Sequence, residues 1–184
     1  MEFKTLDNEE LLRLSLDAMS SDRDADAMMM LKTLLEREPG DANGQYLLAA
    51  LHAQIGMMDR AEEGFRKAVA LAPGMVMARF QLGQLLLVKG DNGSARDILE
   101  PLTGQQDSIG AYARGLFAIA GDDVDGAIRY LGDGLALPQA VPALQRDMDN
   151  LRARLAESLQ QAEVPISNEP IAPVLRMPGA YQGN

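Results

Sequence analysis

Residues Ala42 to Pro73 read ANGQYLLAALHAQIGMMDRAEEGFRKAVALAP, and this stretch decides the fold. It contains two segments with apolar residues at helical spacing, separated by the turn residues Gly56 to Asp59. Pro73 closes the second segment, because proline lacks the N–H that a continuing helix needs. The stretch therefore predicts two helices joined by a short turn.

The same pattern recurs along the chain with one constant period, the spacing from Leu14 to Leu48. Four columns share it: Leu14, Leu48 and Leu82; Ala27, Ala61 and Ala95; Leu31, Phe65 and Leu99; Pro39 and Pro73. A long, constant period of this kind indicates stacked units that bury their apolar faces on their neighbours. We expect such units over residues 8–41, 42–75 and 76–107.

A fourth, degenerate unit follows over residues 108–138. Ala127 comes two positions too early for the period that joins Ala27, Ala61 and Ala95, so two residues are lost. The register of its first helix stays open, because Leu116 keeps the original phase whereas a slip puts Gly115 at the position of a small residue.

These residues resemble the tetratricopeptide repeat family, and the resemblance covers residues 8–107 best. In that family a large residue precedes a small one in the first helix, as in Leu48-Ala49 and Leu82-Gly83. The small residue lets the second helix of the unit approach closely. The resemblance implies an all-α, right-handed solenoid of about three and a half helix pairs within residues 1–140.

Residues 141–162 depart from the repeat and predict one amphipathic helix, Pro142–Ala162. Proline suits a first helical turn. The apolar residues then recur at steps of four or three: Leu144, Met148, Leu151, Leu155 and Leu159. We expect this helix to cap the last apolar face of the solenoid. A second use is a homodimer through residues 142–162, because the same spacing suits a coiled coil.

Residues 163–184 contain four prolines that forbid a helix: Pro165, Pro170, Pro173 and Pro178. The segment is also too apolar for an ordinary solvated linker. We expect an extended tail, which is either a disordered end or a docking segment for this array or for a partner.

Composition disfavours several classes of function. The 184 residues include 27 acidic and 17 basic side chains, and the net charge of −10 opposes binding to nucleic acid or anionic membranes. The chain has no cysteine and one histidine, His52, which leaves no catalytic triad and no multi-histidine metal centre. We expect no enzymatic activity, no cofactor and no metal, and we interpret His52 as a packed core residue.

The sequence shows neither a signal peptide nor a membrane span. The first ten residues carry acids and no apolar segment of a signal peptide, and no apolar stretch reaches the length of a membrane span. We therefore expect a cytoplasmic protein without membrane insertion.

The resemblance implies a binding site on the concave surface, which the first helices of the repeats line. The groove positions of the family correspond to Leu12, Leu16, Met19, Asn43, Tyr46, Ala50, Met77, Phe80, Gln84 and Leu87. Some family members clamp a C-terminal carboxylate with Lys, Arg and Asn, but the fifth position here is Leu12, Tyr46 or Phe80 and the ninth is Leu16, Ala50 or Gln84, which disfavours such a clamp. An apolar groove suits an apolar helix or extended segment of a protein partner.

Two rings are the expected anchors of this groove, since large rigid aromatics dominate such interfaces. Tyr46 and Phe80 are one full period apart and share one repeat position, so stacking should place them side by side and facing outward. The functional hypothesis is a non-catalytic interaction module, either an adaptor or a small acidic chaperone. The alternative is a structural subunit of a larger machine, whose groove is filled by its own tail or by a neighbour.

Overall fold

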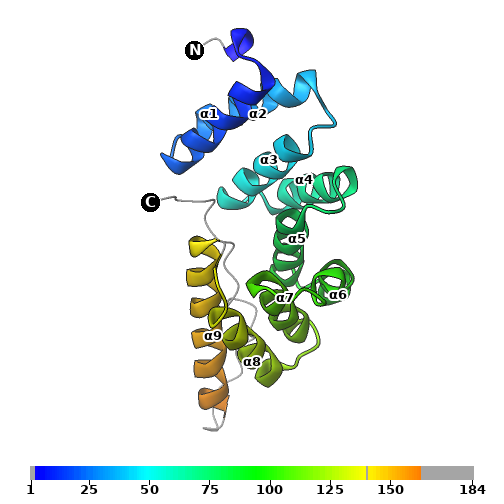
Figure 1. Ribbon diagram of the computed structural model, residues 1–184, viewed down its shortest axis with the longest axis vertical. Coiled ribbons are helices and arrows are strands. Elements are labelled where there is room, and N and C mark those ends of the chain that lie inside the picture. Colours follow the sequence, from blue (N-terminus) through cyan, green and yellow to red (C-terminus); the bar gives the residue numbers. More distant parts are fainter. Residues whose placement is uncertain (1–2, 140, 163–184) are drawn as a thin grey trace. The chain divides into compact units, whose positions relative to one another are not determined.

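The computed structural model describes residues 3–139 and 141–162, and this part of the chain is helical without strands (Figure 1). The α-helices are α1 (Asn8–Ser20), α2 (Asp24–Arg37), α3 (Ala42–Gln54), α4 (Met58–Leu71), α5 (Val76–Val88), α6 (Asn92–Leu99), α7 (Ser108–Ile119), α8 (Val124–Leu135) and α9 (Pro142–Ala162). Two short 3-10 helices are η1 (Phe3–Thr5) and η2 (Glu100–Leu102). The predicted all-α fold class is confirmed.

The described chain forms two compact units, each of which is treated by itself. Unit 1 runs to Gln81 and contains α1 to α4 with the beginning of α5. Unit 2 starts at Leu82 and contains the rest of α5 with α6 to α9. The boundary between the units lies inside α5 and therefore inside the third predicted repeat.

Aspartate side chains begin three of the helices that open a pair. The carboxylates of Asp7, Asp41 and Asp107 accept the backbone N–H groups of Glu10, Gly44 and Gly110 at 2.8, 2.6 and 2.9 Å. Each bond satisfies a donor that the first helical turn leaves without an intrahelical partner. Asp7 and Asp41 are one full period apart, whereas Met75 takes this position in the third repeat and Asp107 follows after the shortened interval.

The same turn closes the first helix of every pair. The N–H groups of Arg23, Met57, Asp91 and Asp123 donate to the carbonyls of Ala18, His52, Leu86 and Ala118, at 2.8 to 2.9 Å. The residue before each donor has a left-handed backbone: Asp22 (φ 56°), Gly56 (φ 80°), Gly90 (φ 77°) and Asp122 (φ 59°). This is a Schellman motif, and it recurs with the period of the repeat, except that the last interval is two positions shorter.

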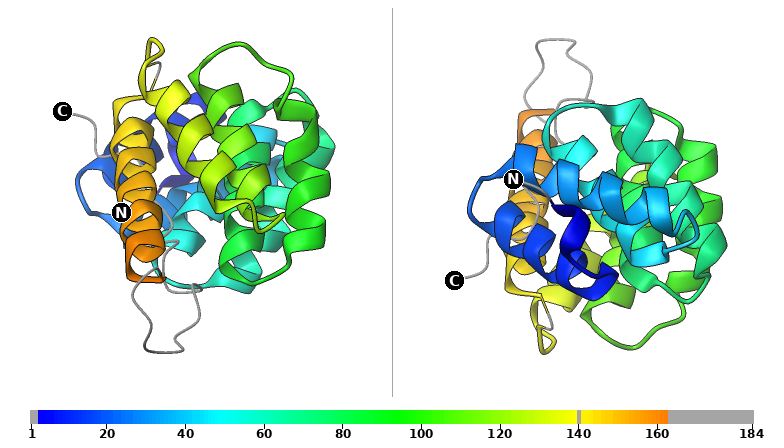
Figure 2. Two further views of the ribbon diagram at one scale, coloured as in Figure 1. Left: turned by 90° about the horizontal axis from the view of Figure 1, so that it is seen from below. Right: turned by 90° about the horizontal axis from the view of Figure 1, so that it is seen from above.

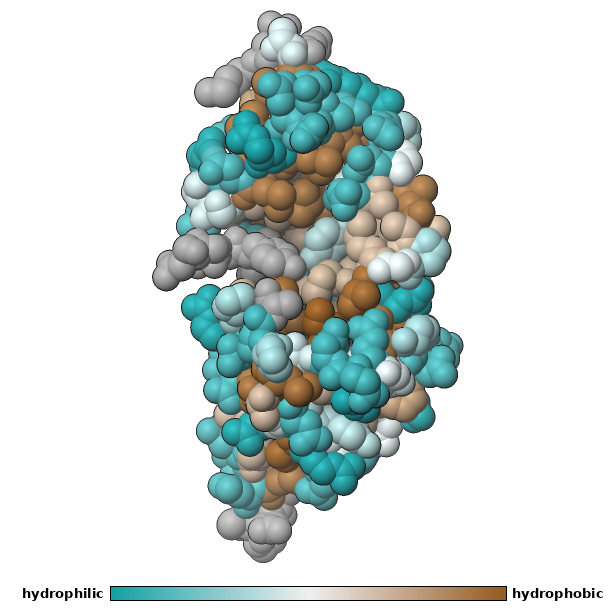
Figure 3. All heavy atoms as spheres, in the orientation of Figure 1, coloured by the Kyte–Doolittle hydropathy of each residue, from teal (hydrophilic) through white to brown (hydrophobic). Residues whose placement is uncertain are grey.

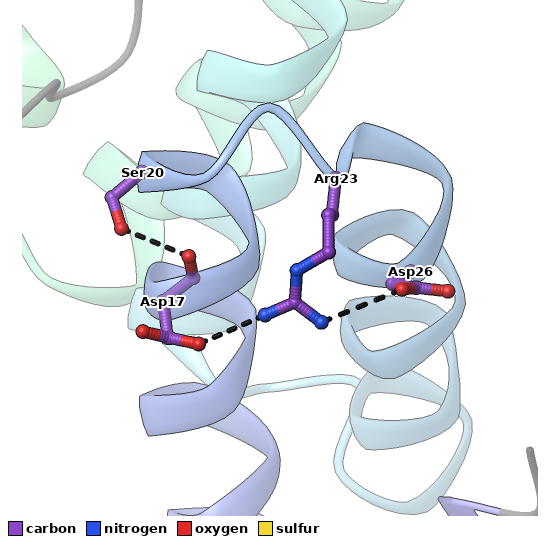
Figure 4. A network of polar contacts seen from close by, with 4 residues as sticks. All are labelled: Asp17, Ser20, Arg23 and Asp26. Atoms are coloured by element: carbon purple, nitrogen blue, oxygen red, sulfur yellow. Dashed lines mark hydrogen bonds and ion pairs between the residues drawn. The ribbon is translucent and has the colours of Figure 1, made fainter.

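Polar side chains add a small clamp at the first of these turns (Figure 4). Arg23 lies between α1 and α2 and pairs with Asp17 at 2.9 Å and with Asp26 at 3.6 Å. The Ser20 hydroxyl donates to the carbonyl of Asp17 at 2.8 Å. All these groups are solvent-accessible, so the pairs contribute little to stability.

Glycines allow the closest helix approaches in unit 2. A Cβ on Gly83 would lie 2.5 Å from the Leu99 side chain, and one on Gly115 would lie 2.8 Å from Leu131. Gly115 therefore occupies in the fourth repeat the place that Gly83 has in the third. This settles the open register of α7 in favour of the two-residue slip.

Pro101 makes the second helix of the third repeat shorter than its counterparts. The α6 helix has 8 residues and gives way to η2, which carries Pro101 in its first turn, whereas α2 and α4 have 14 residues each. Proline removes the backbone donor that another α-helical turn would use. The connection to α7 then starts early, and this is where the repeat loses two residues.

The helix α9 has the bounds that its apolar spacing predicts. Figures 1 and 2 show α9 alongside α8, and the two helices pack on each other. Four residues of its predicted apolar stripe, Leu144, Met148, Leu151 and Leu155, are each at most 5% exposed, and the fifth, Leu159, is half-buried. The prediction for residues 163–184 lies outside the described residues.

Candidate partner-binding surface

The ten residues of the predicted groove come from three helices and fall into both units. The α1 helix carries Leu12, Leu16 and Met19, α3 carries Asn43, Tyr46 and Ala50, and α5 carries Met77, Phe80, Gln84 and Leu87. The first eight belong to unit 1, whereas Gln84 and Leu87 belong to unit 2. The structure therefore brings only the first eight together within one compact unit.

Accessibility separates these residues into two groups. Leu16 is 44% exposed, Asn43 is exposed, and Leu12 and Met77 are half-buried. The remaining six are buried: Met19, Tyr46, Ala50, Phe80, Gln84 and Leu87. As a binding site the whole set stays a prediction, and only the first group offers substantial surface to a partner.

The aromatic position of the repeat is a core position, which differs from the expected outward orientation. Tyr46 is 8% exposed and Phe80 is fully buried. The Tyr46 ring packs on Phe65 of α4, with ring centroids 6.0 Å apart. Phe65, on the second helix of the pair, thus covers the Tyr46 ring. Burial of both rings opposes their predicted role as surface anchors.

Sequence reasoning missed a third member of this aromatic column, Tyr112 of α7. It follows Phe80 by one shortened period and is fully buried, with its ring against Gly134 of α8. Its hydroxyl donates to the Gln139 side chain at 2.8 Å. The loss of two residues hid Tyr112 from the regular period, although the spacing of Ala95 and Ala127 gave the correct offset.

Four large apolar side chains of unit 1 are exposed, on or next to four different helices: Leu16 on α1, Met29 on α2, Ile55 after α3 and Leu71 at the end of α4. Leu12 and Leu16 lie one helical turn apart, on the same face of α1 as the exposed Glu9. In Figure 3 a hydrophobic area lies over the part of the molecule where Figure 1 shows α1, α2 and α3. Ile55, the residue after α3, is 42% exposed. Exposed apolar surface of this kind marks interaction sites more often than chance.

His52 is a packed residue of α3, as the sequence predicts. It is 7% exposed, and its Nε2 atom has no hydrogen-bond partner among the described residues. Burial lowers its pKa, and the positive charges of Arg60 and Lys32 lower the pKa further, against the opposing effect of Glu63. The imidazole is therefore neutral at pH 7 and lies away from solvent.

Metal-binding clusters and membrane-spanning helices are both absent from the described part of the chain. Within residues 3–139 and 141–162, no group of three or more His, Asp or Glu side chains could hold a metal ion. No helix in the same residues is long and apolar enough to cross a membrane.

Solved structures with the same arrangement of helices are found, although no family model and no curated protein matches the sequence. MamA from Desulfovibrio magneticus RS-1, starting at its residue 41, matches with a TM-score of 0.60 and 21% identity, over 85% of this chain and 96% of that one. PilF of Pseudomonas aeruginosa matches with a TM-score of 0.63 and 21% identity, over 88% of this chain and 78% of that one. Another MamA structure gives a TM-score of 0.55 and 18% identity, over 88% of this chain and 100% of that one.

MamA and PilF are tetratricopeptide-repeat proteins. The chain therefore has a tetratricopeptide-repeat fold, and the resemblance that its sequence indicated is confirmed. At these identities the likeness concerns the fold, and function has to be argued from the surface of this chain.

Proposed function

We propose that this protein is a non-catalytic interaction module that holds an apolar segment of a partner protein against α1 and α3. The observation that carries the proposal is Leu16, a large aliphatic side chain that is 44% exposed beside half-buried Leu12. Burying such side chains in a partner interface is favourable by about 25 cal/mol per Å² of apolar surface. The fold supports the proposal, since helix-pair solenoids provide extended binding surfaces.

In this proposal α1 supplies the accessible apolar contacts, through Leu12 and Leu16. Ala50 and Ala53 of α3 are only 7% and 5% exposed and add little area. Their small side chains would let a partner segment that rests on α1 approach α3 closely. An amphipathic helix fits such a surface through apolar residues at spacings of three and four.

Charge defines the flanks of the proposed partner segment. Glu9 shares a face with Leu12 and Leu16 and makes no ion pair within the described residues. The whole chain carries a net charge of −10. A partner segment with lysine or arginine next to its apolar residues would gain complementary charge and faster association.

The finer function is that of an adaptor or small acidic chaperone. A structural subunit of a larger machine is the alternative, with the groove occupied by residues 163–184 or by a neighbouring subunit. Affinity purification with mass spectrometry separates the two. One dominant client supports the adaptor or chaperone, whereas several stoichiometric subunits support the machine component.

A matched pair of variants tests the surface itself. Leu16→Glu puts a charge on the proposed site, and Leu71→Glu makes the same change on α4, where Leu71 is 47% exposed. We expect Leu16→Glu to weaken binding of the purified partner by at least about tenfold in calorimetry, and Leu71→Glu to leave it unchanged. Equal affinities for both variants and the wild type would show that the partner binds elsewhere.

A further inference from the structure

Unit 2 contains a pocket that no repeat pattern predicts. It has a volume of about 320 Å³ and lies among α6, α7 and α8. The residues that line it are Arg96, Thr103, Arg114, Phe117, Ala118, Gly121, Asp123 and Tyr130. Two arginines and two aromatic rings in one pocket are unusual in a chain with a net charge of −10.

Both arginines are held in place by neutral groups. The Arg96 guanidinium lies over the Phe117 ring, 4.4 Å from its centroid. Arg114 donates through Nη1 to the carbonyls of Thr103 at 2.8 Å and Gln105 at 2.9 Å, and its guanidinium lies 5.8 Å from the Tyr130 ring centroid. Cation–π contacts and carbonyl bonds orient a guanidinium without neutralising its charge.

Neither arginine forms an ion pair with a carboxylate of the described residues. Asp123 also lines the pocket, but its Oδ1 accepts the N–H of Gly126 at 2.8 Å as the cap of α8. The Arg96 guanidinium makes no hydrogen bond within the described part of the chain, and Arg114 keeps its Nε and Nη2 donors available there. Guanidinium donors in a fixed fork match the two oxygens of a carboxylate.

We infer that this pocket binds an acidic side chain, aspartate or glutamate, of a protein partner. A carboxylate would bridge the Arg96 and Arg114 guanidiniums, and its methylene groups would pack on the rings of Phe117 and Tyr130. The exposed carboxylate of Asp123 lines the same pocket and repels every anion, and it repels a doubly charged phosphate more strongly than a singly charged carboxylate. The site is separate from the α1 surface and does not depend on it.

An NMR titration of the full chain tests this inference with two small probes. The acidic probe is the acetylated peptide amide Gly-Glu-Glu-Gly, and the control probe is Gly-Gln-Gln-Gly. We expect saturable shifts of the Arg96 and Arg114 Nε–H signals with the acidic peptide only, with a dissociation constant on the order of 1 mM. Absence of saturable shifts, or equal shifts with both peptides, would overturn the inference.

Substitutions separate the pocket from general surface charge. Arg96→Gln should weaken binding of the acidic peptide about tenfold, whereas Arg96→Lys should keep part of the affinity. Arg129→Gln is the matched control, since Arg129 lies over the same Tyr130 ring, 4.8 Å from its centroid, but does not line the pocket. The inference is wrong if Arg129→Gln weakens binding as much as Arg96→Gln does, or if inorganic phosphate binds more tightly than the acidic peptide. Unchanged circular dichroism of each variant confirms that the comparison concerns folded protein.

Discussion

The α3–α4 repeat in unit 1 and the α7–α8 repeat in unit 2 both bring their two helices close together at a glycine, but the glycine lies on different helices of the pair. In the α3–α4 repeat Ala49 stands on the opening helix, and the glycine is on the closing helix, where a Cβ on Gly64 would lie 2.8 Å from the Ala49 Cβ. In the α7–α8 repeat the glycine is on the opening helix, where Gly115 faces Leu131. Close approach of the two helices is therefore the feature that both pairs share, and the helix that supplies the glycine is free to change.

The aromatic position shows a parallel exchange. Tyr46 packs on another ring, Phe65, whereas Tyr112 packs on Gly134 and ends in a hydrogen bond to Gln139. The same repeat position thus holds a tyrosine in both pairs, although the tyrosine contacts the large side chain of Phe65 on α4 in one pair and the glycine Gly134 on α8 in the other. Each ring is enclosed within its own helix pair, so we expect this position to control stability more than binding.

The largest effect is expected at the ring that is enclosed most completely. Tyr112→Ala removes a fully buried ring and should lower the free energy of unfolding by about 3–5 kcal/mol. Tyr112→Phe keeps the ring, loses only the bond to Gln139, and should cost about 1 kcal/mol. Urea unfolding measures both. A loss below about 1 kcal/mol for the alanine variant would mean that this repeat position is a surface position after all.

An intermediate effect is expected from adding a side chain at the glycine of the α7–α8 repeat. Gly115→Ala introduces a Cβ that meets Leu131 at 2.8 Å, and overpacking of this kind costs about 1–3 kcal/mol. Alanine already stands at the matched position of the α3–α4 repeat, Ala49, where Gly64 makes room for it. Leu131→Ala removes that clash, so the double variant Gly115→Ala with Leu131→Ala should be no less stable than Leu131→Ala alone. Additive losses would show that the two residues do not oppose each other.

Much of this architecture could be predicted from the sequence because backbone constraints repeat with the period. The turns, the small column and the bounds of α9 follow from glycine, alanine and proline, whose conformational preferences are local. The register of α7 could not be predicted, since Leu116 and Gly115 satisfied competing alignments until the contact with Leu131 was known. Accessibility of Tyr46 and Phe80 depended on neighbours from other helices, which a repeat position does not specify.

The pocket of unit 2 escaped prediction for a related reason. Its arginines and rings come from three helices and have no common spacing. Thr103, which lines the pocket, directly follows η2, so the early end of α6 at Pro101 affects where it lies. The signal in the sequence was Pro101 itself, because it stands where α2 and α4 continue as α-helix.

A pH-dependent difference is expected between the two repeats, because His52 matches Ala118 at the end of the opening helix. Burial lowers the pKa of His52 in the folded protein below its ordinary value of 6.5. The unfolded chain therefore binds the proton more readily, and the stability that neutral His52 contributes is present above pH 6.5 and lost as the pH falls below it. His52→Ala, which copies the matched residue, should reduce this loss.

The measurement is urea unfolding of wild type and His52→Ala at about pH 7.5 and about pH 5.5. Other titrating groups, such as Asp147, whose pKa is raised by burial, affect both proteins and cancel in the difference. We expect the wild type to lose stability relative to the variant at the lower pH. A constant difference between the two proteins would mean that protonation of His52 is not linked to unfolding.

The smallest effect concerns the turns, where the repeats differ in the residue that takes the left-handed conformation. Gly56 holds this position between α3 and α4, whereas Asp122, with a φ of 59°, holds it between α7 and α8. Side chains other than glycine pay a steric cost there, although aspartate tolerates the conformation better than most. Asp122→Gly should therefore stabilise the protein by about 0.5–1 kcal/mol, or about 2 °C in thermal midpoint. Gly56→Asp is the reverse change, and because nothing lies within 4 Å of an added Cβ, it should destabilise by a similar amount through the backbone alone. If Asp122→Gly lowers the thermal midpoint instead, the aspartate side chain stabilises its turn by more than the left-handed backbone costs. The turns at Gly56 and Asp122 would then share a geometry but differ in how they are stabilised.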